Sequence, residues 1–371
     1  YFFLESMKVS IGSQIKEGPW GGGNAFVVNL SEFLKSKGHE VIYDLKEQDI
    51  DIIILTDPRT NSEGSSFDHK DIKRYLKYVN YQALVFHRVN ECDQRKNTSN
   101  VNEFYIEANK VADSSIFVSS WLQNLYKDEG MSQTRNKVIL GGANTKIFNN
   151  KGIVKWNESS PLRIVTHHWG ANWNKGFQIY KKLDERLANS EFKNKYEFTY
   201  IGNLPKSFKF INSQHIPPLS GVALSSELKK HHLYITASLN EPSGNHHIEA
   251  AQCGLPLLYI ESGGIPEHCN GYGVSFNEIN FFEKLNEFSQ DYFSHQKKII
   301  NYPLNADLMS KNYLDYFYRM LSEKEKIIAD RSYLPTDNKI YKSAYYIFLY
   351  LKKVLVNNKV YRKVIHAFTK E

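Results

Sequence analysis

Two glutamates separated by seven residues, Glu241 and Glu249, lie on either side of a small turn in the stretch EPSGNHHIEAAQ. The residues before the first glutamate have the β-branched and aromatic composition of a strand, and those after the turn have helical spacing. The turn is therefore expected between the carboxyl end of a strand and the start of a helix. Unpaired backbone amides at a helix start, helped by the helix dipole, suit a phosphate group.

The two carboxylates suit a sugar next to that phosphate. Glu249, one turn into the helix, could accept hydrogen bonds from vicinal sugar hydroxyls, as acidic residues do with ribose in dinucleotide folds. Glu241, before the turn, points toward the same space. A simpler alternative is that Glu241 is a solvated loop residue and Glu249 a surface helix residue. The two residues alone do not decide between these alternatives.

The elements that position the turn follow a regular alternation of strands and helices. A chain of 371 residues exceeds the usual size of a single core, which predicts two domains. Buried strands are expected first at 8–14, 39–45, 51–57, 83–89, 114–120 and 136–142, with helices between them at 24–37, 68–79, 102–111 and 121–129.

After a polar stretch at 144–160 the alternation begins again. Strands are expected at 162–168, 196–202, 232–238, 255–261 and, weakly, 273–276, with helices near 175–188, 222–230, 245–253 and 279–290. This pattern predicts an α/β protein of two Rossmann-like, doubly wound parallel-sheet domains that face each other across a cleft. We expect an N-terminal domain at 7–145, a C-terminal domain at 160–310, and C-terminal helices at 311–371 that cross back to the N-terminal domain.

The net charge of +7 is concentrated at the C-terminal end. From Asn338 onward there are eight Lys or Arg and one Glu, which leaves 39 basic and 39 acidic residues in the preceding part of the chain. A neutral body argues against a nucleic-acid-binding protein, whose footprint would be a basic face on the folded domain. Two roles remain open for the aromatic, basic tail: packing against the body, or peripheral contact with an anionic membrane.

Cysteine content and hydropathy indicate a cytoplasmic protein. Its three cysteines are far apart, which favours free thiols in a reducing compartment over a disulfide framework. No apolar run approaches the roughly 20 residues that cross a bilayer, and the first 30 residues lack the layout of a signal peptide. We therefore expect a cytoplasmic protein, at most peripheral on the inner face of a membrane.

The sequence around the two glutamates resembles the signature of retaining glycosyltransferases of the GT-B fold, of the family 4 type (glycosyl transferases group 1). In that signature a Glu, seven residues, Glu motif is followed by a helix, CGLP, a strand and a GG-x-PE turn, matched here by 253–256 and 263–267. The resemblance implies that Glu249 holds the ribose of a nucleotide sugar and that Glu241 contacts the donor sugar. It also implies that the phosphate end of the donor is lined by Ser243, Gly244, Asn245 and His246.

Two further segments resemble landmarks of the same family. The stretch GPWGGGNAFVVNLSEFLKSKGHEV resembles the glycine loop after the first strand, where Gly22 and Gly23 would let the backbone approach the donor closely. In VFHRVNE, His87 comes at the end of the fourth strand, where family members carry a histidine that faces the donor sugar. The alternatives are a flexible glycine loop and a structural histidine.

The segment VTHHWGANWNKGF resembles the family's GR-x-x-x-x-KG element, which supplies an arginine and a lysine to the diphosphate. Lys175 matches the lysine, but His168 and Trp169 occupy the place of the arginine. A histidine with an ordinary pKa near 6.5 could become charged beside a phosphate, although it lacks the fork of an arginine. Packing at a strand end is the alternative for His168. The expected site therefore has one clear cation and lacks the second.

The remaining parts of the site follow from the resemblance. The segment NSQHIPPLSGVALSSELKKHHLYI resembles the loop that passes the nucleobase, which makes Ile216 and its backbone candidates for contact with the base. Stabilisation of the leaving diphosphate would fall to Lys175 and the amides at 243–245. No His or Cys cluster has zinc spacing, and the resemblance implies a metal-independent reaction without a cofactor.

These features lead us to expect a retaining hexosyltransferase that moves a sugar from a nucleoside-diphosphate sugar to a glycan or a lipid-linked acceptor. His87, Glu241 and Lys175 would be its catalytic residues. Two alternatives remain open: a sugar-nucleotide epimerase of the same architecture would turn over the donor alone, and a catalytically impaired protein would bind the nucleotide sugar without transfer. The sequence identifies neither the base, the sugar nor the acceptor.

Overall fold

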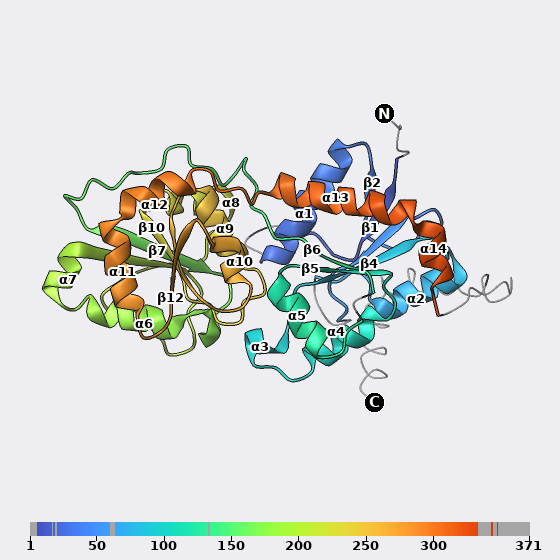
Figure 1. The fold of residues 1–371 in the computed structure, drawn as a ribbon, viewed down its shortest axis with the longest axis horizontal. Helices are drawn as coiled ribbons and strands as arrows, with labels where there is room; N and C mark the ends of the chain where they lie inside the picture. The colour runs from blue at the N-terminus through green and yellow to red at the C-terminus, as the bar shows by residue number, and fades with distance from the viewer. Residues whose placement is uncertain are drawn as a thin grey trace.

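The computed structural model describes residues 6–16, 18, 21–59, 64–132, 134–332, 343 and 347. Two six-stranded parallel sheets, each flanked by helices, form two domains placed end to end (Figure 1). The predicted fold class, two Rossmann-like doubly wound domains, is confirmed. Most of the basic tail that begins at Asn338 lies outside the described residues.

The N-terminal sheet has the strand order β2-β1-β3-β4-β5-β6, with every pair parallel. Its strands are β1 (Lys8–Ile11), β2 (Glu40–Ile42), β3 (Ile52–Leu55), β4 (Leu84–Val89), β5 (Ser114–Phe117) and β6 (Asn136–Val138). All six strands expected from the sequence are present. All are shorter than expected, mostly because the residues at their carboxyl ends belong to loops, some of them buried, rather than to the sheet.

Helices cover both faces of this sheet, and the longer ones have amphipathic sequences. They are α1 (Gly22–Ser36), α2 (His69–Tyr78), α3 (Asp93–Lys96), α4 (Val101–Asn109) and α5 (Ser120–Asp128). Helix α1 packs Phe26, Val27 and Leu30 onto one face, while α2 covers the other with Ile72 and Tyr75. Because side-chain caps satisfy free amides at a helix start, Asp68 and Ser119 fix where α2 and α5 begin.

The C-terminal sheet has the order β12-β11-β10-β7-β8-β9. Its strands are β7 (Leu162–His168), β8 (Tyr196–Gly202), β9 (Gln214–Ile216), β10 (Leu233–Thr236), β11 (Leu257–Ile260) and β12 (Gly273–Phe276). The edge strand β9 was not expected from the sequence. It has three residues, two of them polar and exposed, so it carries no apolar alternation that would reveal it.

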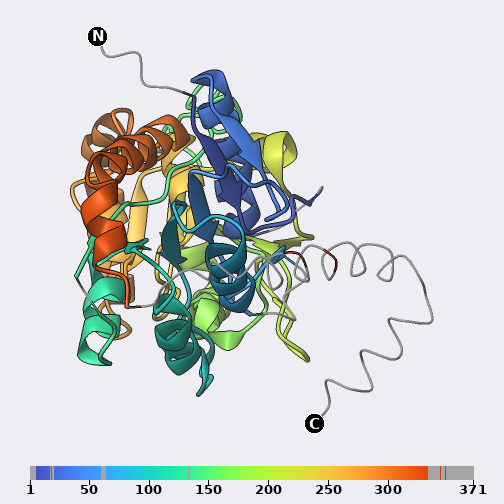
Figure 2. The same cartoon turned by 90° about the vertical axis from the view of Figure 1, so that its right-hand side faces the viewer.

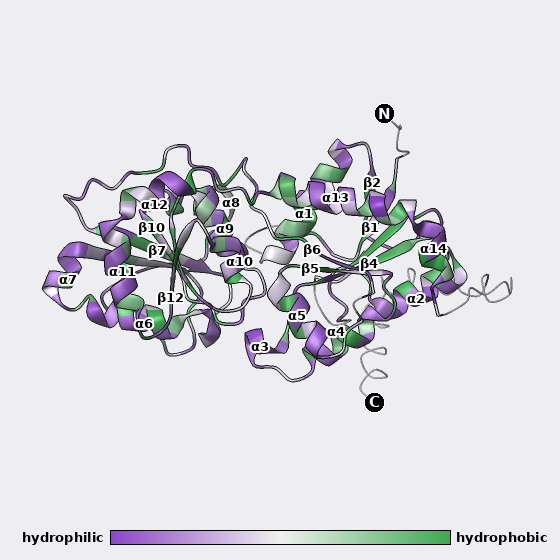
Figure 3. Cartoon of the chain, viewed as in Figure 1, coloured by the Kyte–Doolittle hydropathy of each residue, from purple (hydrophilic) through white to green (hydrophobic). Residues whose placement is uncertain are grey.

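One continuous apolar core joins the helices to this second sheet. The helices are the 3-10 turn η1 (Trp173–Lys175), α6 (Phe177–Arg186), α7 (Ser190–Lys195), α8 (Gly221–Leu228), α9 (Asn245–Gln252), α10 (Ile265–Cys269), α11 (Phe281–Gln290) and α12 (Tyr292–Ile299). Figure 3 shows the apolar colour concentrated in the strands at the centre of each domain.

Helices α13 (Ala306–Ser322) and α14 (Lys324–Ala329) return to the N-terminal domain. The amide of Ala306 donates to the carbonyl of Ala143 at 2.9 Å, so the two chain crossings between the domains lie side by side. Beyond this point α13 packs on α1, with Phe317 and Tyr313 in the same apolar cluster as Phe26. Figure 2 shows these helices, in orange and red, along one side of the blue strands. In the described part of the chain, no helix is both long and apolar enough to cross a membrane.

Candidate functional site

The polar groups singled out in the sequence gather where the carboxyl ends of the two sheets meet. Helices α9 and α10 of the C-terminal domain face α1, α3 and α5 of the N-terminal domain there (Figure 1). We call this region the domain boundary. Ligands of doubly wound sheets bind outside the carboxyl ends of the strands, which is where these loops lie.

Glu241, in the loop between β10 and α9, is the centre of a buried ionic group. Only 3% of the residue is exposed. One carboxylate oxygen accepts a short hydrogen bond from Lys175 Nζ, at the end of η1. The other lies 3.2 Å from Nε of Arg95, on α3 of the opposite domain. A single carboxylate thus bridges a cation from each domain.

The charges of this group hold one another in place. Burial alone would raise the pKa of Glu241, but Arg95 and Lys175 outweigh it and the pKa lies well below its usual range. Burial lowers the pKa of Lys175, and the nearby Glu241 opposes that effect. Burial would lower the pKa of Arg95, yet Glu241 and Glu91 raise it. The site therefore contains two cations for its central carboxylate.

The main chain around Glu241 is fixed by two glycines of the loop after β11. The amide of Gly264 donates to the Glu241 carbonyl at 2.8 Å. A Cβ atom on Gly263 would lie 2.5 Å from that carbonyl oxygen, and one on Gly264 would lie 2.6 Å from Cβ of Ser119 in the N-terminal domain. The GG-x-PE turn thus needs its glycines for close backbone contact with the loop and with the other domain.

Glu267, the last residue of that turn, joins the domains. Its carboxylate accepts hydrogen bonds of 2.8 Å from the amides of Ser120 and Trp121, the first residues of α5. Free amides at a helix start attract a carboxylate, so Glu267 caps a helix of the opposite domain.

The Ser-Gly-Asn turn begins α9 as the sequence predicts. Gly244 has φ +76, and a Cβ there would lie 2.7 Å from the His246 ring, so only glycine fits. Ser243 Oγ lies 3.2 Å from Nε2 of His268. Asn245 faces the N-terminal domain: a Cβ on Gly22 would lie 2.9 Å from its Cγ. The start of α9 thus lies close against the start of α1.

Glu249 is held by a histidine rather than exposed on the surface. Its Oε2 lies 3.0 Å from Nε2 of His167, and its side chain is 16% exposed. Nδ1 of His167 lies 3.2 Å from the hydroxyl of Tyr234 in β10. This chain of polar contacts orients the Glu249 carboxylate and leaves part of it accessible.

His168 and His246 lie beneath the turn, in the interior. Their rings are 4.5 Å apart; His168 Nε2 lies 2.9 Å from the Tyr180 hydroxyl, and His246 Nε2 lies 2.8 Å from Thr236 Oγ1. Burial lowers the pKa of both histidines well below the ordinary value. Burial thus disfavours the charged form of His168, and its contact with a phosphate stays a prediction.

Three other predicted site residues are not brought into the Glu241 group. His87 is fully buried in β4, where Nδ1 lies 2.9 Å from Asn109 Oδ1 and burial lowers the pKa to about 4. Its direct role in sugar transfer stays a prediction. Ile216 lies on the edge strand β9, half-buried against the C-terminal core. Gly23 has open space around its Cα.

Several residues of the domain boundary were missed in the sequence. Arg95 and Glu91 belong to the segment NECDQRK directly after β4, and Glu267 was noted only as part of a motif. The density of charge at the carboxyl end of a parallel strand was the available signal, because such positions line ligand sites. The pairing with Glu241 could not be foreseen, since Arg95 lies 146 positions earlier in the chain.

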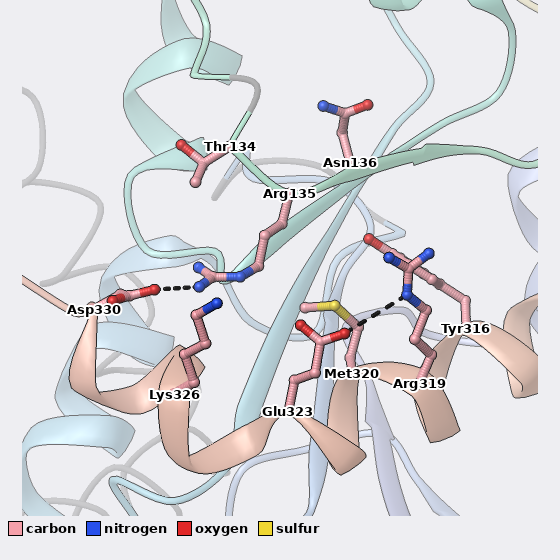
Figure 4. Close-up of a pocket in the computed structure, with 9 residues that line it drawn as sticks. All are labelled: Thr134, Arg135, Asn136, Tyr316, Arg319, Met320, Glu323, Lys326 and Asp330. Carbon is pink, nitrogen blue, oxygen red and sulfur yellow. Dashed lines mark hydrogen bonds and ion pairs between the residues drawn. The ribbon is translucent and has the colours of Figure 1, made fainter.

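No group of three or more His, Cys, Asp or Glu side chains in the described ranges could hold a metal ion. A separate pocket of about 500 Å³ lies between β6 and helices α13 and α14 (Figure 4). Arg135 and Asp330 form an ion pair there, and Arg319 lies 3.7 Å from Glu323. Because its charges are largely paired internally and it lies away from the Glu241 group, we assign it no ligand.

Comparison with solved structures identifies the architecture. The chain superposes on the catalytic domain of starch synthase IV from Arabidopsis thaliana, bound to ADP and acarbose, with a TM-score of 0.61 and 13% identity, covering 85% of this chain and 99% of that one. A glycosyltransferase from Rickettsia africae gives a TM-score of 0.58 at 13% identity, covering 86% and 99%. Anabaena HepE in complex with UDP-glucose gives 0.57 at 11%, also covering 86% and 99%. The chain therefore has the GT-B fold.

Sequence comparison adds a weaker similarity. A segment of 139 residues is 26% identical to the gpi3 subunit of phosphatidylinositol N-acetylglucosaminyltransferase from Schizosaccharomyces pombe. The match covers 34% of this chain and 30% of that protein. No family model matches the sequence.

Proposed function

We propose that this protein is a glycosyltransferase that moves a sugar from a nucleoside-diphosphate sugar to an acceptor, with retention of the anomeric configuration. The observation that carries the proposal is the Glu241 group: a buried carboxylate beside Lys175, at a helix start, between two GT-B domains. The solved relatives bound to UDP-glucose and ADP support a nucleotide-containing donor.

Each part of the site has a role in this proposal. Glu249, held by His167, accepts hydrogen bonds from the ribose hydroxyls. The amides at the start of α9 and the ammonium group of Lys175 bind the diphosphate and stabilise the charge that develops as it leaves. Glu241 orients Lys175 and contacts the donor sugar. The acceptor hydroxyl attacks from the face that the diphosphate leaves, and a phosphate oxygen accepts its proton.

The acceptor in this proposal is a glycan or a lipid-linked sugar. The name of the gpi3 relative supports a lipid-linked acceptor, since that protein acts on phosphatidylinositol. Contact with an anionic membrane through the basic tail would bring the enzyme to such an acceptor. The reaction is proposed to need no metal, because Lys175 and the helix amides supply the positive charge.

Thermal unfolding in the presence of UDP, GDP, ADP and their common sugar conjugates tests the donor site. One nucleotide should raise the unfolding temperature selectively; a ligand at 100 times its dissociation constant adds about 2.7 kcal/mol. Glu249→Ala should abolish the shift, whereas the exposed Glu278→Ala should keep it. Failure of every nucleotide to stabilise the wild type would contradict the proposal.

Product analysis then separates transfer from its alternatives. Incubation of the stabilising nucleotide sugar with candidate acceptors should give an acceptor-dependent product whose anomeric configuration matches the donor. Conversion of the donor alone into a second nucleotide sugar would point to an epimerase instead. Binding without any product from a broad acceptor panel would indicate a catalytically impaired protein.

A further inference from the structure

Arg95 occupies the position of a second cation at the donor site. The arginine that the resemblance places shortly before Lys175 is absent, because the segment 165–177 contains no arginine, and His168 within it is buried. Arg95 comes instead from α3 of the N-terminal domain, and its Nε lies 3.2 Å from the same carboxylate that binds Lys175. Two positive groups therefore flank Glu241, one from each domain.

The helix that carries Arg95 is anchored to the opposite domain. Asn174 donates a hydrogen bond of 3.3 Å to the carbonyl of Arg95, and Asn240 donates one of 3.3 Å to the carbonyl of Gln94. Within its own domain, Glu91 is 5% exposed and accepts from Arg95 Nη1 at 3.1 Å. These contacts fix the guanidinium at the domain boundary rather than leaving it as a mobile surface charge.

The hydrogen-bonding capacity of Arg95 is incompletely used. Its buried Nε has no hydrogen-bond partner of acceptable geometry among the described groups, although Glu241 is close enough for an ion pair. The side chain is 25% exposed, compared with 8% for Lys175. Because a quarter of the side chain is exposed, an anion has more access to Arg95 than to Lys175, and the fork of a guanidinium matches phosphate oxygens.

We propose that Arg95 is a diphosphate-binding residue, so that the leaving group of the donor is held by one cation from each domain, Lys175 and Arg95. This inference rests on the proposed function. It explains how a site without the usual arginine binds a diphosphate. It also links donor binding to the placement of the two domains, because the anion joins α3 to the start of α9.

Binding measurements with inorganic pyrophosphate and with UDP, GDP and ADP, each beside its parent nucleoside, test this role. Arg95→Met removes the charge and keeps the length of the side chain. Arg95→Lys keeps a charge without the fork. Lys96→Met is the matched control, because Lys96 is the next residue, also pairs with Glu91, and is 44% exposed.

We expect Arg95→Met to lower the affinity for pyrophosphate and for the preferred nucleoside diphosphate by roughly 10- to 100-fold. This is the range in which a charge-assisted hydrogen bond contributes to binding. Binding of the parent nucleoside should be unchanged, and Lys96→Met should bind like the wild type. The affinity of Arg95→Lys for these ligands should lie between that of the wild type and that of Arg95→Met. If Arg95→Met does not fold, the loss of diphosphate affinity in Arg95→Lys alone decides whether Arg95 binds the diphosphate.

Other outcomes overturn the inference and separate it from the proposed function. Unchanged pyrophosphate binding in Arg95→Met and Arg95→Lys, or an equal loss of diphosphate and nucleoside, would reduce Arg95 to a structural contact. If the wild type bound pyrophosphate but no nucleotide, the proposed nucleotide-sugar donor would be contradicted. The role of Arg95 in anion binding would still be decided by the pyrophosphate affinities of the variants. A wild type that binds neither would contradict both.

Discussion

At the scale of single residues, the main feature is one carboxylate that compensates two cations. Glu241→Gln keeps the shape of the side chain but leaves Lys175 buried without a counter-charge. Because an uncompensated buried charge is costly, we expect the free energy of unfolding to fall by about 3–5 kcal/mol. Urea denaturation would measure this loss.

The control is a carboxylate paired on the surface. Glu185 is 59% exposed and pairs with Lys181 one helical turn away, so Glu185→Gln should change stability by no more than about 0.5 kcal/mol. Similar small losses in both variants would show that the Glu241 group contributes little to folding.

The residues of the site differ in how far the sequence could predict them. Glu241, Gly244 and Glu249 belong to one contiguous motif, so a strand, a turn and a helix place them together by local geometry. Arg95 comes from another domain, and no local rule relates it to Glu241. His168 shows the opposite limit: its spacing suits a phosphate contact, but packing against Tyr180 and His246 directs its ring into the interior.

At the scale of elements, the starts of α1 and α9 pack closely. A Cβ on Gly22 would lie 2.9 Å from Cγ of Asn245, whereas one on Gly23 would meet nothing within 4 Å. We therefore expect Gly22→Ala to displace Asn245 and to weaken nucleotide stabilisation of the protein. Gly23→Ala, one residue along the same helix, should bind the nucleotide like the wild type. Its free energy of unfolding should rise by up to ~1 kcal/mol because alanine has the higher helix propensity.

Thermal unfolding with and without the preferred nucleotide would compare these two variants. Equal nucleotide shifts in Gly22→Ala and the wild type would show that the contact with Asn245 does not constrain the proposed donor site. An equal loss in both variants would instead indicate a general requirement for a flexible glycine loop.

Long apolar elements were predictable, and short ones were not. The buried strands and the amphipathic helices α1, α2 and α5 follow from periodicity over many residues. Helices α3 and α10 have only four and five residues, too few for a period to be visible, and tertiary contacts hold them. These short helices carry Arg95 and Glu267, so the elements that build the domain boundary were the least predictable.

At the scale of the whole molecule, the returning helices attach the C-terminal end of the described chain to the N-terminal sheet. Arg331 makes two hydrogen bonds to Asp113, at 2.6 and 2.8 Å, and donates to the Ala83 carbonyl at 2.7 Å. Both charged side chains are almost fully buried. Arg331→Met should destabilise the protein by about 3–5 kcal/mol because it leaves Asp113 buried and uncompensated.

Arg319, on α13, provides the comparison. Its side chain is 70% exposed and lies 3.7 Å from Glu323, so Arg319→Met should cost at most about 1 kcal/mol in urea denaturation. If Arg331→Met were equally mild, the buried pair with Asp113 would contribute little to holding this end of the chain on the N-terminal sheet.

The buried histidines make the stability of the molecule depend on pH. Burial lowers the pKa of His87, His231 and His232 to about 4 in the folded state. The unfolded chain, with ordinary histidine pKa values near 6.5, therefore binds more protons between pH 6.5 and 4. The histidine contribution to stability is fully present above pH 6.5 and is lost as the pH falls through this window.

Urea denaturation between pH 7.5 and 5 measures this effect before the carboxylates with lowered pKa values begin to titrate. Each histidine that titrates only in the unfolded chain adds a slope of up to about 1.4 kcal/mol per pH unit. His231→Asn keeps a hydrogen-bond donor for the Glu227 carbonyl. It removes one titrating group, so the slope of the unfolding free energy against pH should fall by up to the contribution of one histidine. A free energy of unfolding that stayed constant from pH 7 to 5 would mean that these histidines become protonated in the folded protein, so that water would have to reach their buried rings.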